Sequence, residues 1–561
     1  MNPPLVRMVA ALPVLSADVD TSWNQYSDAA GRRAEFPLGI DLIHDNGMRS
    51  FELFTWARWA CIPFSLIGAW AVYCWSRQLF GDVAGIAALT MWCLSPNILA
   101  HGQMITPDAG ATSLGVLCCW RFWRWIPKPT WKNTLWFGLS LGLVGLTKFT
   151  WVILGPLLLV MWSVQKLGHR QSFENGAEDS AQPHVTSARP KLSSQRAKWI
   201  RFCVALLLAH QLILLAYAYD RVFQPLGEFE FVSDALKPNP KVRSGNIFRE
   251  TWLGQIPVPL PACYLEGIDV QKHEFARADR PSYLAGKFRY PGWWYYYLYA
   301  LGVKVPLGFW VIGVITVVCC ITRKTQIASW QDQLFLLLPA VVILSLVSSH
   351  TGINRHMRYV LPVFPFVLIW ISQAFASSSF RSKTFLTACA GLLWAAGSSL
   401  WVYPHSLSYF NEAVGGPRNG HKHLINSNID WGQDLLLLRD WVQDHPEHED
   451  ISIAYFGGYD ASAAGLMGSS PPAGPKTERM HAEMPRGPQP GWYAVSVNYF
   501  YRLYKLRWLD DQGKIVAAPR CDYSYFLEFE PVETIGYSIY IYYITEEQAR
   551  EVRERIWADK D

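Results

Sequence analysis

Long apolar segments are the feature that most constrains what this chain can fold into. A helix needs about 20 apolar residues to cross the hydrocarbon core of a bilayer, where its backbone groups must bond within the segment. Only 17% of the residues are charged, against about 25% in typical soluble domains. The sequence therefore predicts an α-helical protein that crosses the membrane many times. The ten predicted spans are 53–76, 83–100, 106–123, 133–147, 149–165, 200–219, 295–321, 333–349, 358–376 and 384–403.

Two of these spans, 133–147 and 149–165, form one apolar block that is interrupted by Gly145-Leu146-Thr147-Lys148. A single helix through the block would bury Lys148 at the centre of the bilayer, at a cost of several kcal/mol. Two short helices with Lys148 at the turn between them avoid that cost. We therefore expect a turn at Lys148.

Lys and Arg gather in alternate connecting loops, and such loops lie on the cytoplasmic side. This assignment predicts that residues 1–50, 221–294 and 404–561 lie outside the cytoplasm. The polar segment 166–199 is predicted to be a cytoplasmic linker within the spanning domain 51–403. We expect a multi-pass protein of the cell membrane. The formal net charge of +5 does not indicate a nucleic-acid partner.

After Pro404 the long apolar runs end, and Asn, Asp, Gly and Pro become frequent. The spacing of apolar residues predicts a small extracytoplasmic α/β domain. Its predicted helices are 434–444 and 546–557, and its predicted strands are 451–456, 492–498 and 537–544. The sequence also leaves open a disulfide between Cys263 and Cys521, which both fall in predicted external segments.

The first candidate site residues are His101 and Asp108, in the external hairpin between two predicted spans. Asp108 follows Thr106-Pro107 at the start of a helix, where the helix dipole also favours a carboxylate. Two readings of Asp108 are therefore open, a helix cap and a functional acid. His101 with Asp108 offers two metal-binding side chains, but two residues do not define a metal site.

A second polar cluster stands at the external end of two predicted spans. A short external loop normally avoids Arg, whereas a guanidinium binds phosphate through two parallel hydrogen bonds. A lipid headgroup or a lipid-linked phosphate is the natural partner of this cluster. The alternative is interfacial snorkelling to ordinary phospholipid. The cluster consists of His350, Asn354, Arg355, His356, Arg358 and Tyr359.

The third candidate is the stretch Asn2-Pro3-Pro4-Leu5-Val6-Arg7, which leads into a short apolar segment. By itself, this stretch is a weak signal for a turn followed by a helix. Arg7 is a candidate to meet a lipid headgroup or a substrate phosphate.

Several short motifs follow one another along the chain. They are Asn2-Pro3-Pro4-Leu5, Leu79-Phe80-Gly81, Leu94-Ser95-Pro96, His101, Thr106-Pro107-Asp108, Gly145-Leu146-Thr147-Lys148-Phe149 and Arg358-Tyr359-Val360-Leu361-Pro362. Their order resembles the C-type glycosyltransferase superfamily, in its branch of protein O-mannosyltransferases and aminoarabinose transferases. The resemblance covers about residues 1–403. A later stretch, including Asn428-Ile429-Asp430-Trp431-Gly432-Gln433-Asp434, resembles a tail seen on bacterial members.

The resemblance implies an enzyme that transfers a sugar from a polyprenyl-phosphate donor to an acceptor hydroxyl on the outer face of the membrane, with inversion. Asp108 resembles the second acidic residue of the family's site. Arg355 and Arg358 are the implied phosphate cradle, with Lys148 as a further candidate. The acceptor is a protein, a lipid or a glycan, and a divalent metal stays open because relatives differ in using one.

The chain departs from the family at its start. In the family, an Asp, often Asp-Glu, follows a first transmembrane helix and precedes the Asn-Pro-Pro-Leu-like segment, and it is the favoured catalytic base. This sequence begins after that point, so we expect a missing first helix. Two other functions remain as alternatives. They are a non-catalytic membrane assembly or binding protein and a transporter of a lipid-linked substrate.

Overall fold

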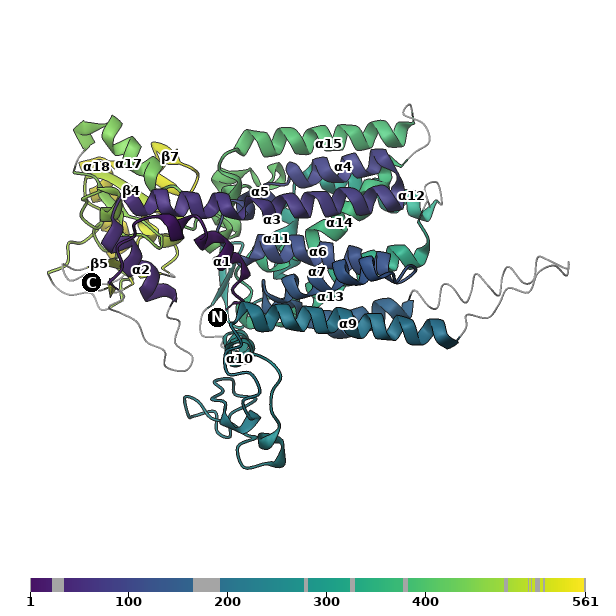
Figure 1. Ribbon diagram of the computed structural model, residues 1–561. Coiled ribbons are helices and arrows are strands. Elements are labelled where there is room, and N and C mark those ends of the chain that lie inside the picture. Colours follow the sequence, from purple (N-terminus) through teal and green to yellow (C-terminus); the bar gives the residue numbers. More distant parts are fainter. Residues whose placement is uncertain are drawn as a thin grey trace.

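The computed structural model is a bundle of roughly parallel helices with a smaller domain at one end (Figure 1). The bundle contains the apolar segments, and the smaller domain contains the C-terminal part of the chain. The structure describes residues 2–22, 35–164, 192–276, 281–322, 328–376, 382–448, 450–478, 483–502, 504–505, 507–509, 515–517 and 520–558.

The bundle confirms the prediction of a polytopic helical protein. Helical residues fall within each of the ten predicted spans. Among the described residues, five helices are long and apolar enough to cross a membrane, or up to seven if each bent pair counts as one span. The bundle elements are α3 (Arg49–Phe80), α4 (Asp82–Cys93), α5 (Pro96–Gly102), α6 (Pro107–Trp125), α7 (Trp131–Gly145), the segment Phe149–Val164 with η2 (Phe149–Ile153), α9 (Leu192–Ala216), α11 (Tyr296–Lys304), α12 (Leu307–Ile321), α13 (Trp330–Ser349), η6 (Met357–Val363), α14 (Phe364–Ile371), η7 (Ser372–Phe375) and α15 (Lys383–Val402).

Two predicted spans are not continuous helices. The span 83–100 is bent by 59° between α4 and α5, and the span 295–321 is bent by 110° between α11 and α12. Pro96 is the first residue of α5, and Pro306 is the N-cap of α12. Proline lacks the backbone N–H that would continue the preceding helix, so each break falls where a proline begins a new one. The predicted turn at Lys148 is confirmed, because α7 ends at Gly145 and η2 begins at Phe149.

Glycines allow helices of the bundle to approach closely. A Cβ atom on Gly308 of α12 would meet the backbone oxygen of Gly391 of α15 at 1.9 Å. A Cβ atom on Gly115 of α6 would meet the ring of Trp151 at the same distance. Small residues at such contacts are typical of helix packing in membranes, where close van der Waals contact drives association.

The predicted external segment 1–50 contains α1 (Leu5–Ala11), η1 (Val14–Ser16) and α2 (Glu35–Asn46). Helix α3 has 32 residues, about 48 Å at 1.5 Å per residue, so it is longer than a bilayer core of about 30 Å. Its first turns project beyond the bundle, where Phe51 stacks on Tyr459 with ring centroids 4.4 Å apart. The start of α3 therefore supports the C-terminal domain.

The predicted external segment 221–294 lies beside the bundle and includes α10 (Ala262–Ala276), η3 (Leu226–Glu228), η4 (Trp252–Gln255) and the hairpin of β1 (Ser282–Leu284) and β2 (Lys287–Arg289). No disulfide joins Cys263 to Cys521 in the structure, so the disulfide that the sequence left open is not formed.

The C-terminal domain is built on a four-stranded sheet in the order β3 (Ser452–Ala454), β4 (Gly491–Ser496), β8 (Ile539–Ile544) and β7 (Glu533–Ile535). Only the β3–β4 pair is parallel. Helix α17 (Leu435–Asp444) packs on the face that carries Ala494 and Ile541, while α18 (Glu546–Trp557) contributes Ala549 to a core with Tyr493 and Tyr542. A separate hairpin joins β5 (Arg507–Leu509) and β6 (Ile515–Ala517). The predicted helices and strands are thus present, with shorter strands.

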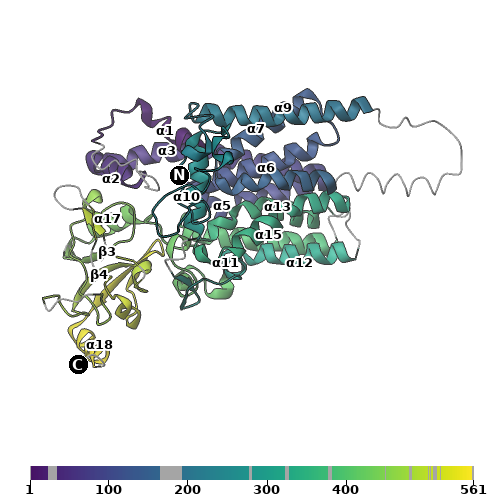
Figure 2. The same cartoon turned by 90° about the horizontal axis from the view of Figure 1, so that it is seen from below.

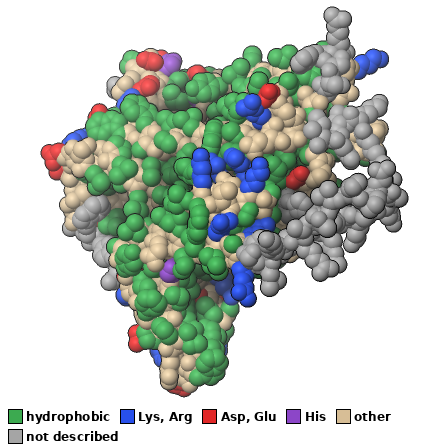
Figure 3. Space-filling model, turned by 45° about the vertical axis from the view of Figure 1, so that its right-hand side comes forward, with side chains coloured by type: hydrophobic (Ala, Val, Ile, Leu, Met, Phe, Trp, Pro, Cys, Tyr) green, Lys and Arg blue, Asp and Glu red, His purple; other side chains and the backbone are tan. Residues whose placement is uncertain are grey.

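Basic side chains gather at the end of the bundle far from the C-terminal domain (Figure 3). The end of α3, the end of α6 and the start of α9 lie there, while α2 and the C-terminal domain lie at the other end (Figures 1 and 2). Of the predicted linker 166–199, residues 192–199 are helical and belong to α9, because the helix continues beyond the apolar segment. Residues 166–191 lie outside the described residues.

Candidate active site

Asp108 stands in the first turn of α6, where Pro107 occupies the first helical position. The Asp108 carboxylate does not cap the helix. Instead, its Oδ1 accepts a hydrogen bond of 2.7 Å from Nζ of Lys148, the extended residue between α7 and η2. Its Oδ2 lies 3.7 Å from Nε of Arg358 on η6. We call Asp108, Lys148 and Arg358 the ionic cluster.

The ionic cluster is almost fully enclosed. The side chains of Asp108 and Lys148 are 4% and 6% exposed, and that of Arg358 is 15% exposed. Tyr359 lies beside both cations, with its ring centroid 4.8 Å from Lys148 Nζ and 5.6 Å from Arg358 Cζ. Two cations face one carboxylate, so the cluster carries a net positive charge in a region of low dielectric constant. Such a site attracts a further anion.

Arg355 and His356 lie in the loop that leads into η6, just before Arg358. The guanidinium Nε of Arg355 is buried and has no hydrogen-bond partner among the described residues. A buried guanidinium N–H without an acceptor is costly, so this atom is available to a ligand. The ring of His356 packs edge-on against Tyr359, at 5.4 Å between centroids.

The C-terminal domain reaches this loop through Ser427 and Asn428, at the end of the bundle where the domain sits. Arg358 Nη1 donates to Ser427 Oγ at 3.3 Å, and His356 Nδ1 lies 2.8 Å from the same oxygen. Asn428 accepts a hydrogen bond from the backbone N–H of Met357 at 2.8 Å. The block that begins at Asn428 was visible in the sequence, but its role was not, because nothing in one sequence joins it to Met357, 71 residues earlier.

Trp431 from the same segment lies over Arg358, with its ring centroid 4.0 Å from Cζ. A guanidinium on an indole face is a favourable cation–π contact. Trp431 is half-buried. The candidate site is therefore shared between the helical bundle and the C-terminal domain.

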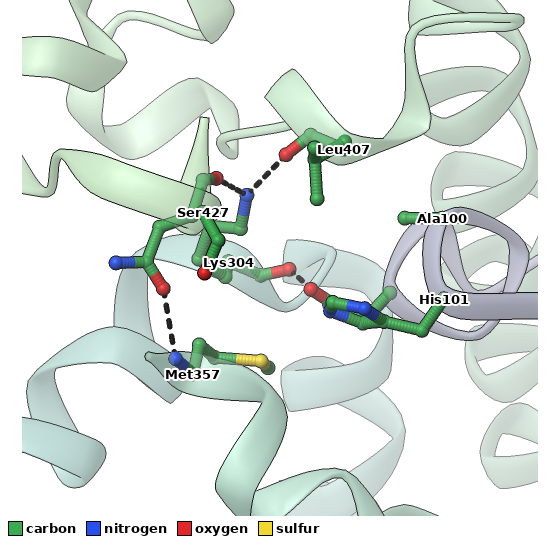
Figure 4. Close-up of a pocket in the computed structure, with 8 residues that line it drawn as sticks. Ala100, His101, Lys304, Met357, Leu407 and Ser427 are labelled. Carbon is green, nitrogen blue, oxygen red and sulfur yellow. Dashed lines mark hydrogen bonds between the residues drawn. The ribbon is translucent and has the colours of Figure 1, made fainter. Parts of the chain in front are cut away.

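The structure also has a small pocket (Figure 4), whose lining includes Ser427, the residue that accepts a hydrogen bond from Arg358. Lys304, at the end of α11, is buried, and its ammonium donates to the backbone oxygens of Leu407 (2.7 Å) and Asn428 (2.5 Å). His101 is also buried, and its Nδ1 has no hydrogen-bond partner among the described residues. Lys304 was not among the site residues predicted from the sequence. Its presence inside a predicted span was a usable signal, since ionisable residues in such segments are costly and often functional. The pocket is lined by Asn97, Ala100, His101, Lys304, Met357, Leu407, Ser427 and Asn428.

Three predicted site residues lie apart from the ionic cluster. Arg7 is exposed, and its guanidinium donates to the backbone oxygen of Asn2 at 2.5 Å. His350 contacts the carbonyl of Leu346 through Nδ1 at 2.8 Å and has the ring of Phe275 beside it. Helix α1, which carries Arg7, nevertheless contacts the turn that carries Lys148. The N–H of Leu5 donates to the backbone oxygen of Leu146, two residues before Lys148.

Metal binding was left open by the sequence. Among the residues that the structure describes, no group of three or more His, Cys, Asp or Glu side chains is arranged to hold a metal ion.

Residues 50–175 match the family model of the dolichyl-phosphate-mannose-protein mannosyltransferases. The matched segment contains Asp108 and Lys148 but neither Arg358 nor the C-terminal domain. No curated protein matches the sequence. Among solved structures, the crystal structure of ArnT from Cupriavidus metallidurans bound to undecaprenyl phosphate aligns with a TM-score of 0.40 and 13% sequence identity, over 92% of each chain. The family match agrees with the superfamily that the sequence motifs indicated.

Proposed function

We propose that this chain, whose residues 50–175 match the family model of the dolichyl-phosphate-mannose-protein mannosyltransferases, transfers a sugar from a polyprenyl-phosphate donor to an acceptor hydroxyl. The observation that carries the proposal is the ionic cluster, in which a buried carboxylate is held between an ammonium and a guanidinium. The cluster combines a proton acceptor with two phosphate-binding cations, which are the two functions that this transfer needs.

The charge distribution supports an outer-face reaction and an extracytoplasmic C-terminal domain. Basic residues mark the cytoplasmic side of a membrane protein. Arg77, Arg121 and Arg124 stand near the cytoplasmic ends of α3 and α6 in this orientation, opposite to the C-terminal domain. The enclosed ionic cluster then lies near the outer-face end of the bundle, beside that domain.

In the proposed reaction, the donor phosphate first competes with Asp108 for the two cations. Arg358 has the bidentate geometry that suits a phosphate, Lys148 adds a point charge, and the unpaired Nε of Arg355 adds a third donor. As the cations turn to the phosphate, the Asp108 carboxylate becomes available. His101, His356 and Tyr359 surround the same space and are proposed to orient the ligands.

Transfer itself exchanges one bond at the anomeric carbon of the sugar. The acceptor oxygen attacks that carbon while its bond to the phosphate oxygen breaks, and the configuration inverts. The acceptor proton passes to Asp108, and the electron pair of the broken bond leaves with the polyprenyl phosphate, whose added charge the cations stabilise. The proposed site does not use Arg7, Asn2 or His350, which have other contacts.

Binding and turnover should respond differently to two substitutions. Purified full-length chain in nanodiscs is titrated with undecaprenyl phosphate, and transfer is followed with radiolabelled polyprenyl-phosphate mannose and a membrane extract as acceptor. Arg358→Ala should weaken binding at least about tenfold, since it removes a charge-assisted pair. Asp108→Asn should bind undecaprenyl phosphate as tightly as the unchanged chain or more tightly, yet lose about 100-fold or more in turnover.

The matched control is Arg249→Ala, which removes an arginine from an exposed ion pair with Glu230. It should leave both binding and turnover unchanged. Unchanged binding in Arg358→Ala, or full turnover in Asp108→Asn, would refute the proposal.

A further inference from the structure

We propose that the C-terminal domain contributes to phosphate binding at the candidate site. Three of its residues, Ser427, Asn428 and Trp431, act as positioning residues that keep Arg358 in the conformation that binds the donor phosphate. This inference rests on the proposed function, because it assigns a role to the domain in the same phosphate site. The domain would otherwise be an appendage whose contacts only anchor it.

The first argument is the surroundings of the Arg358 guanidinium. Its nearest partners are the Ser427 hydroxyl at 3.3 Å, the Trp431 ring at 4.0 Å and the Asp108 carboxylate at 3.7 Å. Two of these three partners come from the C-terminal domain. If the phosphate displaces Asp108, Ser427 and Trp431 become the main groups that keep the long arginine side chain in one conformation. A flexible side chain that is already ordered loses less entropy on binding.

The second argument is the backbone of the loop that carries Arg358. Asn428 accepts from the N–H of Met357 at 2.8 Å and donates to the carbonyl of Arg355 at 2.7 Å. One side chain thus fastens the loop on both sides of His356. The loop contacts Asn428 through backbone groups, so its path is set by the C-terminal domain and not by its own sequence alone.

The third argument is that the segment 426–431, which contains Ser427, Asn428 and Trp431, is itself held in place. The backbone oxygen of Asn428 accepts from the buried ammonium of Lys304 at 2.5 Å. The side chain of Asn498, next to β4, accepts from the N–H of Asn426 at 2.6 Å and donates to the carbonyl of Asp430 at 3.1 Å. The segment 426–430 is therefore bound to the bundle through Lys304 and to the C-terminal domain through Asn498. A rigid segment is what a positioning role requires.

The test compares binding of a phosphorylated and a neutral lipid to the full chain. Undecaprenyl phosphate and undecaprenol are each titrated against the unchanged protein and against Ser427→Ala, Trp431→Leu and Trp431→Phe. Ser427→Ala and Trp431→Leu should each weaken undecaprenyl phosphate binding about three- to thirtyfold and leave undecaprenol binding unchanged. Trp431→Phe keeps an aromatic face and should recover most of the affinity.

Two further variants make the outcome decisive. Trp441→Leu is the matched control, because it makes the same change in the same domain at a residue that contacts Glu533 and Trp492 instead of Arg358. It should bind both lipids normally. Arg358→Ala tests the premise: if it binds undecaprenyl phosphate normally, the proposed function fails and this inference fails with it.

Three results would overturn the inference alone. The first is normal phosphate binding in Ser427→Ala and Trp431→Leu while Arg358→Ala loses it. The second is an equal loss for undecaprenol, which would mean that the contacts serve only to hold the domain in place. The third is an equal loss in Trp441→Leu.

Discussion

The Asp108–Lys148 ion pair gives the sharpest quantitative prediction. At the 2.7 Å between Nζ and Oδ1, Coulomb's law with an effective dielectric constant of about 20 gives an attraction of about 6 kcal/mol. The same estimate for Asp108 and Arg358 at 3.7 Å is about 4 kcal/mol. Desolvation of the charges offsets most of this attraction. Removing one partner of a buried pair nevertheless costs about 3–5 kcal/mol, because the other charge stays buried.

The two single substitutions should therefore differ. Asp108→Asn leaves two cations without their carboxylate, so we expect a loss of unfolding free energy near the top of that range. Lys148→Met leaves Asp108 with Arg358 and should cost less. The double variant leaves only Arg358, which retains Trp431 and Ser427. Its loss should fall short of the sum of the single losses by about 2 kcal/mol or more.

The assay is thermal unfolding of the purified full chain in detergent, followed with a thiol-reactive dye. Cys118 and Cys119 are fully buried on α6, the helix that carries Asp108, so their labelling reports the opening of that helix. The exposed thiol of Cys263, on α10 outside the predicted spans, reacts first and gives the baseline. A double variant whose loss equals the sum of the two single losses would refute the argument that the two charges depend on each other.

Two further predictions concern stability. Burial raises the pKa of Asp430 to about 7, so its proton is held more tightly in the folded chain than in the unfolded one. The contribution of this proton to the free energy of unfolding is fully present below about pH 4 and is lost as the pH rises to about 7. Urea unfolding of the purified chain should show less of that pH dependence in Asp430→Asn, and an unaltered profile would contradict this. Gly308→Ala should destabilise the chain by about 1–3 kcal/mol because its Cβ would overlap Gly391. Gly302→Ala, whose Cβ meets nothing within 4 Å, should not, and equal melting temperatures for the two variants would contradict the packing argument.

The sequence predicted the bundle well because span length and composition are local properties. The turn at Lys148 was predictable for the same reason, since a lysine at the bilayer centre carries a cost that any fold must avoid. The two bent spans were not predicted. Their prolines, Pro96 and Pro306, were visible, but a proline in a spanning helix is often accommodated, and only the packing around it decides whether the helix bends or breaks.

Within the candidate site, Asp108, Lys148, Arg355 and Arg358 were recognisable as costly polar residues at helix ends. Sequence reasoning also included Arg7 and His350, which the structure keeps apart from the ionic cluster. All these side chains satisfy the same criterion of charge near an apolar segment. The criterion does not say in which direction a side chain points. It therefore cannot separate a residue that faces the ionic cluster from one that faces solvent.

The sequence by itself determined that this chain is a multi-pass helical protein with an α/β domain after residue 404, because hydrophobic length and periodicity act within one segment. Only the tertiary structure decided that Asp108 contacts both Lys148 and Arg358. It also decided that Ser427 and Trp431 contact Arg358 and that Asn428 binds the loop before it. Those contacts join residues up to 250 positions apart in the chain, the largest separation being that of Asp108 and Arg358. Their energies depend on distance in space, which periodicity along one sequence does not encode.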